Sequence, residues 1–301
     1  MRHASLFDET FDPGQASAYD LLLAPHRHGI DVAVHDGLRR RFIVYHEHRF
    51  RISDDTEWRA AFQSLLAAQP WLAARFRSVK VGWRGRCYTV LPKEFFVPAE
   101  AKLLLNRLSR VGEYDTLYYN RVTEDVLLLF AIPSELINAL IHTFSHFTVL
   151  HQETTLLRLG LQQFRRVTCA VMHLSQEYVT ASLFQSGQLL KHTAFDALMP
   201  ADILYYVAAL LNPVEAAFIK PKKGRKGAAA ATYKLVGQGV RLESLSVKEE
   251  HWLLSTAVEP LVEEYYPRYE HSLLPLGHSF AYSLEPYREA AAGLFSLILY
   301  S

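Results

Sequence analysis

The histidines are the most direct candidates for chemistry, because the chain carries 14 of them in 301 residues. Two pairs, His26 with His28 and His46 with His48, have a spacing that places both imidazoles on one face of an extended segment. Neutral imidazole is a common ligand of transition metals, so convergence of the four would give a metal site. No cysteine or carboxylate at metal-ligand spacing completes such a set. We therefore predict that these histidines face solvent at strand edges and that the chain has no metal site.

Two predicted hairpin turns, one in each half of the chain, could bind phosphates only if they offered the right groups. Such a loop requires a small residue, free backbone N–H groups and a nearby carboxylate that orients metal-bound water. The first turn, over residues 24–29, contains Pro25, which has no N–H, and no aspartate precedes Gly29. The second turn, over residues 172–177, contains neither glycine nor aspartate. Both turns are predicted to be unable to hold phosphates, so we expect no bound cofactor.

Motifs for other catalytic mechanisms are missing from the sequence. There is no Gly-x-Ser-x-Gly elbow, Walker-type Gly-Lys-Ser/Thr loop, Gly-x-Gly-x-x-Gly or His-Glu-x-x-His. The two cysteines, Cys87 and Cys169, lie in apolar runs, which predicts buried thiols in a reducing compartment rather than a nucleophile or a disulfide. We therefore name no catalytic residue, and the sequence favours a protein that is not an enzyme.

The charge of the chain is balanced overall and uneven locally. Lys and Arg number 32 against 31 Asp and Glu, so no global field attracts nucleic acid or acidic lipid. Residues 220–231 are the exception, with five cations in seven positions: Lys220, Lys222, Lys223, Arg225 and Lys226. We predict a mobile loop that contacts several phosphates of RNA or of a ribonucleoprotein. A plain solvated surface loop is the other interpretation, favoured by the lack of interleaved aromatic residues.

Length and composition set the class of protein. Half of the residues are hydrophobic, which excludes a disordered chain, and 301 residues usually form two domains. No window reaches about 18 consecutive apolar residues, and the first residues do not resemble a signal peptide, so we expect a cytoplasmic protein without a membrane span.

The elements that must position the candidate residues follow a pattern that occurs twice. Apolar stretches and turn signals over residues 19–52 predict an antiparallel three-stranded meander, followed by an amphipathic helix over 54–69. Residues 167–195 predict a second meander, followed by a helix over 200–211. The repeat predicts two lobes after a polar leader: 1–18 as the leader, 19–165 as the N-terminal lobe and 166–301 as the C-terminal lobe.

Other elements are predicted between and after the two repeats. They are strands over 79–83 and 86–91, a helix over 98–109, strands over 114–122 and 126–132, a helix over 134–144, a strand over 147–151, a helix over 153–164, a strand over 233–235, a helix over 248–265 and a strand over 293–300.

Several of these stretches resemble an uncharacterised family of Bacteroidetes-type bacterial proteins whose known fold is that of actin-like ATPases. The segments that carry the resemblance are 87–96, 125–133, 151–157, 195–196 and 201–206. The resemblance implies an α/β, two-lobed actin-like (duplicated ribonuclease H-like) fold with a β-β-β-α core in each lobe.

The resemblance also bears on a nucleotide site. Active actin-like proteins hold ATP-Mg between their lobes, so Gly29 would line a degenerate cleft in this chain. Gly237 and Gly239 resemble the glycine pair that contacts adenosine, although a lone Gly-x-Gly is more often an ordinary turn.

Two functions are compatible with this sequence. The first is a non-catalytic actin-like binding or scaffold protein that contacts an unidentified protein partner through its cleft and the basic loop. Genes of the resembling family tend to lie near those for a ribosomal RNA methyltransferase, which implies a link to ribosome or RNA maturation. The alternative is a nucleotide-binding ATPase or kinase of the actin-like superfamily that uses unorthodox phosphate loops and ATP-Mg.

Overall fold

The computed structural model divides the chain into two compact units, residues 1–156 with 276–301, and residues 157–275. The division differs from the predicted lobes, because the C-terminal segment belongs to the first unit. The residues that the structure describes are 5–166, 168–174, 178–196, 202–206, 208–210, 233–239, 264, 270–273, 279–281, 284, 294 and 297.

The sheet of the first unit is built on the predicted meander. β2 (Tyr19–His26), β3 (Gly29–Asp36) and β4 (Arg41–Arg49) pair antiparallel. β5 (Ser78–Trp83) and β9 (Thr148–His151) continue the sheet parallel to β2. Every residue of β2 and β3 is buried, which explains why their sequences are nearly continuous apolar runs rather than alternating ones.

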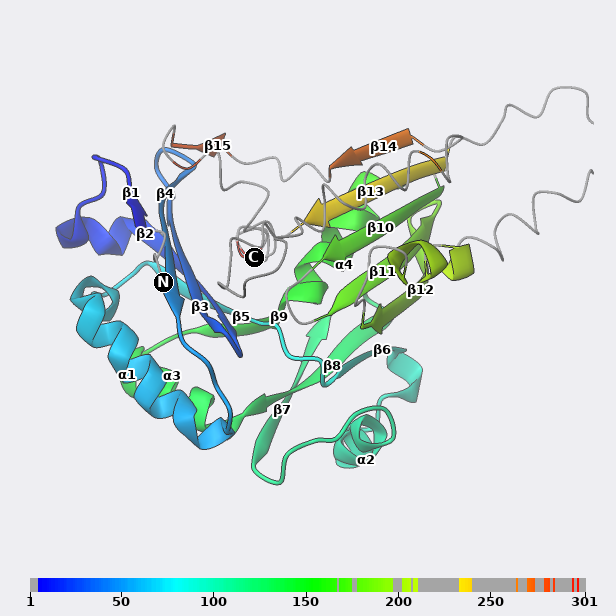
Figure 1. Cartoon of the computed structure of the whole chain (residues 1–301), viewed down its shortest axis with the longest axis horizontal. Helices are drawn as coiled ribbons and strands as arrows, with labels where there is room; N and C mark the ends of the chain where they lie inside the picture. Colours follow the sequence, from blue (N-terminus) through cyan, green and yellow to red (C-terminus); the bar gives the residue numbers. More distant parts are fainter. Residues whose placement is uncertain are drawn as a thin grey trace, which may run out of the picture. The chain divides into compact units, whose positions relative to one another are not determined.

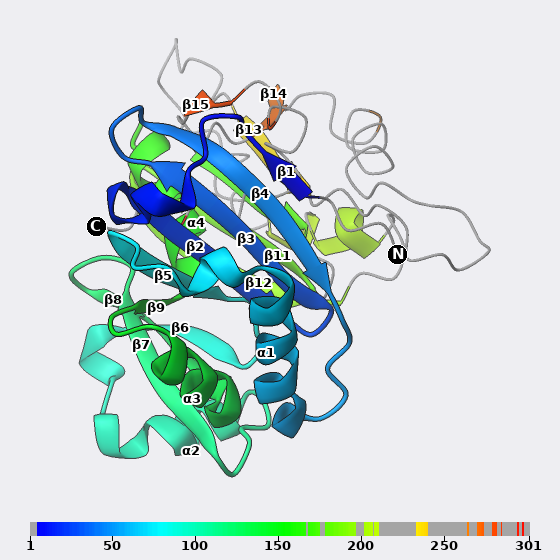
Figure 2. The same ribbon diagram turned by 90° about the vertical axis from the view of Figure 1, so that its left-hand side faces the viewer.

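Two helices lie along this sheet and pack against each other (Figures 1 and 2). α1 (Trp58–Ala68) buries Trp58, Phe62 and Leu65, whose spacing places them on one face of the helix. α3 (Ser134–Thr143) follows β8, and the ring of Phe144 just beyond it lies 6.2 Å from the ring of Phe62. α3 begins at the predicted residue and ends one residue before the predicted end. α1 begins four residues after the predicted start at residue 54, because Asp55–Glu57 forms a separate 3-10 turn.

A small antiparallel sheet is inserted between β5 and β9. β8 (Val126–Pro133) is its central strand, with β6 (Tyr88–Pro92) on one side and β7 (Asp115–Arg121) on the other. α2 (Ala101–Asn106) packs on this sheet and is shorter than predicted, because Pro98–Glu100 forms a separate 3-10 turn. This insert has a core of its own, made of Leu91, Ala101, Leu105, Val111, Leu127, Leu129 and Ala131.

The second unit contains the second predicted meander. α4 (Gln152–Gln163) leads into it from β9, and β10 (Thr168–Leu174), β11 (Val179–Gln185) and β12 (Gln188–Phe195) then pair antiparallel. β13 (Tyr233–Gly239) and β14 (Glu270–Leu273) extend the sheet parallel to β10. Figure 1 shows the order β12-β11-β10-β13-β14. Residues 202–206 and 208–210 are helical, in agreement with the predicted second helix.

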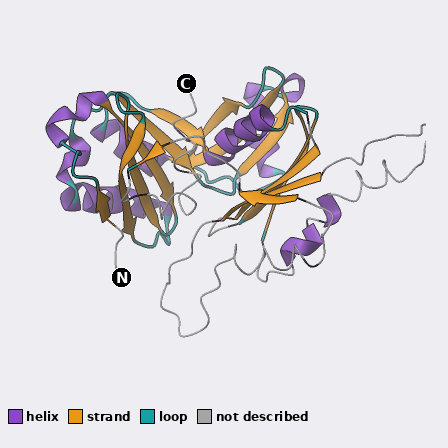
Figure 3. Cartoon of the chain, turned by 90° about the horizontal axis from the view of Figure 1, so that it is seen from above, coloured by secondary structure: helices purple, strands orange, loops and turns teal. Residues whose placement is uncertain are grey.

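The two sheets have the same topology. In each, an antiparallel meander places its first strand in the middle, and two further strands follow parallel to that first strand: β4-β3-β2-β5-β9 in one unit and β12-β11-β10-β13-β14 in the other. Figure 3 shows helices beside the strands in both units. The predicted repeat is therefore present as a duplicated fold.

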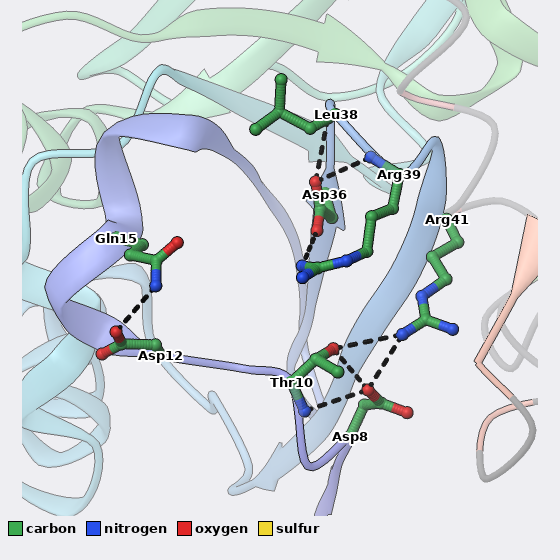
Figure 4. A network of polar contacts seen from close by, with 8 residues as sticks. All are labelled: Asp8, Thr10, Asp12, Gln15, Asp36, Leu38, Arg39 and Arg41. Carbon is green, nitrogen blue, oxygen red and sulfur yellow. Dashed lines mark hydrogen bonds and ion pairs between the residues drawn. The ribbon is translucent and has the colours of Figure 1, made fainter.

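The prediction of a polar leader apart from the first lobe is wrong, because Ser5–Phe7 within it is a strand of the first sheet. β1 (Ser5–Phe7) pairs antiparallel with the outer edge of β4, and β15 (Ser279–Phe280) pairs parallel with the same strand. Figure 4 shows how polar contacts hold the leader: Nη2 of Arg41 lies 3.4 Å from Oδ1 of Asp8 and 3.2 Å from Oγ1 of Thr10. Asp36 accepts the N–H groups of its own turn in the same region. A strand of three residues is too short to show periodicity, and covering an exposed sheet edge requires only such a short segment.

The predicted C-terminal strand over 293–300 is also wrong. Leu294 is α-helical and Leu297 lies in a 3-10 turn, and both side chains are fully buried. A short apolar run can fit a buried helix as well as a strand, and periodicity alone does not separate the two. The predicted helix over 248–265 lies outside the described residues except for residue 264, which is helical. Among the described residues, no helix has the length and apolar character needed to span a membrane.

Candidate functional site at the carboxyl edge of the first sheet

Three parallel strands of the first unit end at the same edge of their sheet. β2 ends at His26, β5 at Trp83 and β9 at His151. Ligands of open α/β sheets bind outside the carboxyl ends of parallel strands, so this edge is the first place to look for a site. The residues that gather there are polar and buried.

An ion-pair network fills the part of the edge near the β2–β3 turn. Nη2 of Arg84, which directly follows β5, lies 2.8 Å from Oδ2 of Asp31. Nη1 of Arg49 lies 3.3 Å from Oδ1 of the same carboxylate, and its Nη2 lies 2.8 Å from Oε2 of Glu47. The hydroxyl of Tyr45 donates to Glu47 at 2.6 Å. Tyr45, Glu47 and Arg49 alternate along β4, so the strand places all three on one face.

The network controls the protonation of its members. Burial raises the pKa of the Asp31 carboxyl, but Arg84, His26 and Arg49 outweigh burial and hold that pKa well below its usual range. Burial lowers the pKa of His26, and the opposing effect of Asp31 does not restore it. Burial, Asp31 and Glu47 together raise the pKa of Tyr45 well above its usual value. At neutral pH Asp31 is therefore ionised and His26 is neutral.

The β2–β3 turn uses its own polar groups internally. The N–H of His28 donates to Nδ1 of His26 at 3.3 Å. Nε2 of the same ring faces the ion-pair network, 3.2 Å from Nη1 of Arg49 and 3.5 Å from Oδ1 of Asp31. The carbonyls of Arg27 and His28 accept the N–H groups of Ile52 and Phe50 at 2.8 and 3.2 Å.

The other end of the edge, at the start of α4, repeats this arrangement. His151 is fully buried, its Nε2 donates to the carbonyl of Gly85 at 2.8 Å, and its Nδ1 accepts the N–H of Glu153 at 3.3 Å. His26 and His151 are thus both the last residue of a parallel strand, and each accepts the backbone N–H two residues further on. Asn120 of β7 is hydrogen-bonded to the same end of β9. Its side chain donates to the carbonyl of Val149 and accepts the N–H of His151.

Gly29 is required by the geometry of the turn. Its φ of +155° is rarely adopted by residues with a side chain, and a Cβ there would lie 2.4 Å from the carbonyl oxygen of His48. We predict that Gly29→Ala lowers the free energy of unfolding by about 1–3 kcal/mol or more, measured by urea denaturation. Gly187→Ala is the comparison, since Gly187 also has a positive φ, +78°, but the nearest atom to its added Cβ is 3.6 Å away. Equal losses in the two variants would contradict the steric argument at Gly29.

The histidine predictions have mixed outcomes. The expectation of solvent-facing rings is wrong for His26 and His46, which are 2% and 3% exposed. They do not converge, because His26 joins the ion-pair network while His46 hydrogen-bonds to Ser5 of β1. Among the residues that the structure describes, no group of three or more His, Cys, Asp or Glu side chains is placed to hold a metal ion. Both cysteines are free, and Cys169 is buried while Cys87 is half-buried.

The remaining predicted site residues are placed as follows. Gly29 lies at the edge described above, in the first unit. Gly237 and Gly239 lie inside β13, opposite Met172 and Leu174 of β10, so the strand predicted over 233–235 is longer than predicted and includes both glycines. Their nucleotide contact stays a prediction. The five cations of the basic segment lie outside the described residues, and their RNA contact also stays a prediction.

Sequence reasoning missed the residues that dominate this edge. The available signal was the position of four charged residues within or next to buried strands: Asp31, Glu47, Arg49 and Arg84. A charge in a buried strand needs a partner, yet Arg84 and Asp31 are 53 residues apart, so the pairing itself was not readable.

The comparisons with known proteins address the family and the fold. The profile of a family described as protein of unknown function (DUF3822) matches residues 8–216, which is more than half of the chain. The chain belongs to this family. No curated protein matches the chain.

Solved structures agree with the family assignment. A Bacteroides thetaiotaomicron protein, described as having an actin-like ATPase fold and unknown function, aligns with a TM-score of 0.68 and 16% identity over 88% of this chain and 93% of that chain. The predicted actin-like fold is thereby confirmed for this DUF3822 member.

Two further structures align less closely. A PilM-PilN type IV pilus biogenesis complex has a TM-score of 0.45 and 11% identity over 92% of this chain and 97% of that chain. The cytoplasmic domain of EpsL from the Vibrio cholerae type II secretion system has a TM-score of 0.39 and 12% identity over 80% and 95%.

Proposed function

We propose that the chain is a cytoplasmic, non-catalytic actin-like protein that binds or scaffolds a partner. The observation that carries the proposal is the internally bonded β2–β3 turn. A loop that cradles phosphates must offer free N–H groups to the ligand. In this turn the N–H of His28 is already donated to His26, and the turn is tied to residues 50–52 through its carbonyls.

The charges at the same edge support this proposal. Arg49 and Arg84 are the cations that a polyphosphate would use, and both are paired with Asp31. Side chains of Arg84 and Asp31 are 6% and 5% exposed. A nucleotide would have to separate a buried ion pair, and uncoupling such a pair costs about 3–5 kcal/mol. The carboxylates of the edge thus neutralise its arginines, and the edge offers no excess positive charge to phosphates.

The chain is therefore expected to release no phosphate from ATP-Mg above the rate of a protein-free control. Phosphoryl transfer depends on positioning and on charge neutralisation, and this edge supplies neither to a nucleotide. The measurement is phosphate release by the purified full-length chain and by its Arg84→Met and His151→Phe variants. Turnover by the parent that disappears in folded variants would refute the proposal. Release above the control that is equal in all three proteins would also contradict the expectation, and it would place the source of the release outside this edge.

One observation favours the alternative, a nucleotide-binding enzyme with unorthodox loops. Gln152, the first residue of α4, is fully buried. Within the described part of the chain, neither the nitrogen nor the oxygen of its side-chain amide has a hydrogen-bond partner. A buried amide without partners is costly, and a polar ligand would relieve that cost. The same ATP-Mg experiment decides between the two functions. The link to ribosome or RNA maturation remains part of the proposal, with the partner unidentified.

A further inference from the structure

The two sheets share a β-bulge as well as a topology. In the first unit the register of β3 against β4 shifts after Val34, and Ile43 is the extra residue of β4. In the second unit the register of β11 against β12 shifts after Leu183, and Leu190 is the extra residue of β12. In both units two residue pairs separate the bulge from the hairpin turn. The bulge therefore aligns β12 with β4 residue by residue.

The two aligned strands differ in what covers their outer edge. β1 pairs antiparallel with Val44–His46 of β4, and β15 pairs with the two residues before the bulge. β12 is the last strand of its sheet, and no strand of the described residues pairs with its outer edge. The positions of β12 that correspond to Val44–His46 are Lys191–Thr193. The bulge does not prevent strand addition, because β4 has the same bulge and is covered.

The exposure of the side chains follows this difference. Ile43 and Val44 are fully buried in the first unit. Their counterparts are not, since Leu190 is 48% exposed and Lys191 is also exposed. An edge strand presents a row of backbone N–H and C=O groups that can pair with another chain. β12 therefore offers a strand edge with an exposed leucine on it.

The charge on β12 restricts what fits against this edge. The strand contains one lysine, Lys191, and no carboxylate. Arg165 lies beside the hairpin turn, and Asp196 follows the other end of the strand. Opposite charges on directly facing residues of two strands stabilise their pairing, and like charges destabilise it. In the first unit Phe7 faces Val44, and at the corresponding place a carboxylate suits Lys191.

We infer that β12 accepts an extended segment of a partner protein, which pairs antiparallel with Lys191–Thr193 as β1 pairs with Val44–His46. The segment places a carboxylate opposite Lys191. Main-chain hydrogen bonds supply the affinity in this mode of recognition, and alternate side chains supply the specificity. A nucleic acid lacks the peptide N–H and C=O groups that such pairing needs. The inference rests on the proposed binding role and identifies the strand that serves it.

The test uses the full chain and fluorescent nine-residue peptides of alternating Thr and Val with a central Glu. In an antiparallel pair only every second residue of a strand hydrogen-bonds to a given neighbour. N-methylation of the peptide at alternate residues in one phase should therefore weaken binding at least tenfold. N-methylation in the other phase should change the affinity less than twofold. A peptide held by its side chains would not distinguish the two phases.

A charge exchange then places the binding on β12. Lys191→Glu should weaken binding of the Glu peptide at least fivefold and strengthen binding of a matched peptide with a central Lys. Arg75→Glu is the matched control, because it reverses an exposed cation of the other unit, and it should change neither affinity more than twofold. Thermal melting of both variants verifies that the exposed substitutions leave the fold intact.

Four results would overturn the inference. These are no binding of any peptide, equal loss in the two N-methylated phases, an unchanged preference for the Glu peptide in Lys191→Glu, or a dimer of the chain that Lys191→Glu dissociates. The last result would assign the edge to a second copy of the chain. Each of them leaves the phosphate release from ATP-Mg as it is, so a failure of this inference is distinguishable from a failure of the proposed function.

Discussion

Asp31→Ala is expected to lower the free energy of unfolding of the first unit by about 3–5 kcal/mol. Asp31 is the shared partner of Arg84 and Arg49 and also faces Nε2 of His26. Removing it leaves two guanidinium groups in a buried site with only Glu47 as a counter-charge. Urea denaturation followed by tryptophan fluorescence measures the loss, since Trp83 directly precedes Arg84 in the chain.

Two controls separate the ion pair from a general effect of substitution. Asp31→Leu combined with Arg84→Met removes both charges of the closest pair and should recover a large part of the lost stability. Asp55→Ala removes a partly exposed aspartate that lies 3.7 Å from Arg27 and should cost less than about 1 kcal/mol. A loss of less than 1 kcal/mol in Asp31→Ala would show that the network is not a buried ion-pair system.

Acidification is expected to destabilise the first unit strongly. Burial raises the pKa of Asp20, but hydrogen bonds from His35, Arg77 and Ser78 outweigh it and hold that pKa far below its usual range. Asp31 behaves in the same way. These two carboxyls therefore take up protons at a higher pH in the unfolded chain than in the folded chain. The stability that they contribute is complete above about pH 5 and falls as the pH drops below the unfolded pKa of about 3.9. Each unit of difference in pKa contributes about 1.4 kcal/mol.

His26 adds to the same trend at higher pH. Its folded pKa lies below the usual 6.5, so the unfolded chain is protonated first, and stability begins to fall as the pH drops through about 6.5. Urea denaturation at a series of pH values from 7 to 3 gives the profile, and Asp20→Asn should flatten its lower part. A free energy of unfolding that is constant over this range, or that rises on acidification, would contradict the burial and pairing of these groups.

The duplicated fold was readable from the sequence because its signals are local. The runs of β2, β3 and β4, the Asp36-Gly37 turn and the turn at Ser186-Gly187 each specify a conformation within a few residues. The order of the strands was not readable in this way, since pairing β2 with β5 and β5 with β9 depends on contacts far apart in the chain.

The candidate site was predictable only in part, for the same reason. Pro25 and the lack of an aspartate before Gly29 predicted that the first turn is a poor phosphate loop, and this stays a prediction. The structure adds the internal hydrogen bonds of the turn, which the sequence did not indicate. That His26 itself accepts the N–H of His28 depends on a buried ring orientation, and no spacing rule encodes it. The pairing of Asp31 with Arg84 and Arg49 is a tertiary contact between three segments, visible beforehand only as charges beside apolar runs.

The measurement that tests the central claim most directly is the melting temperature of the full-length chain with and without ATP-Mg. A ligand that binds only the folded state stabilises it by about 2.7 kcal/mol when present at a hundred times its dissociation constant, which shifts the melting temperature by several degrees. With its turn N–H used by His26 and its arginines paired with Asp31, the carboxyl edge should accept no nucleotide, so we predict the same melting temperature with millimolar ATP-Mg as with Mg²⁺ alone. A rise of several degrees that depends on ATP concentration and is absent in Arg84→Met would contradict this account and establish the nucleotide-binding alternative.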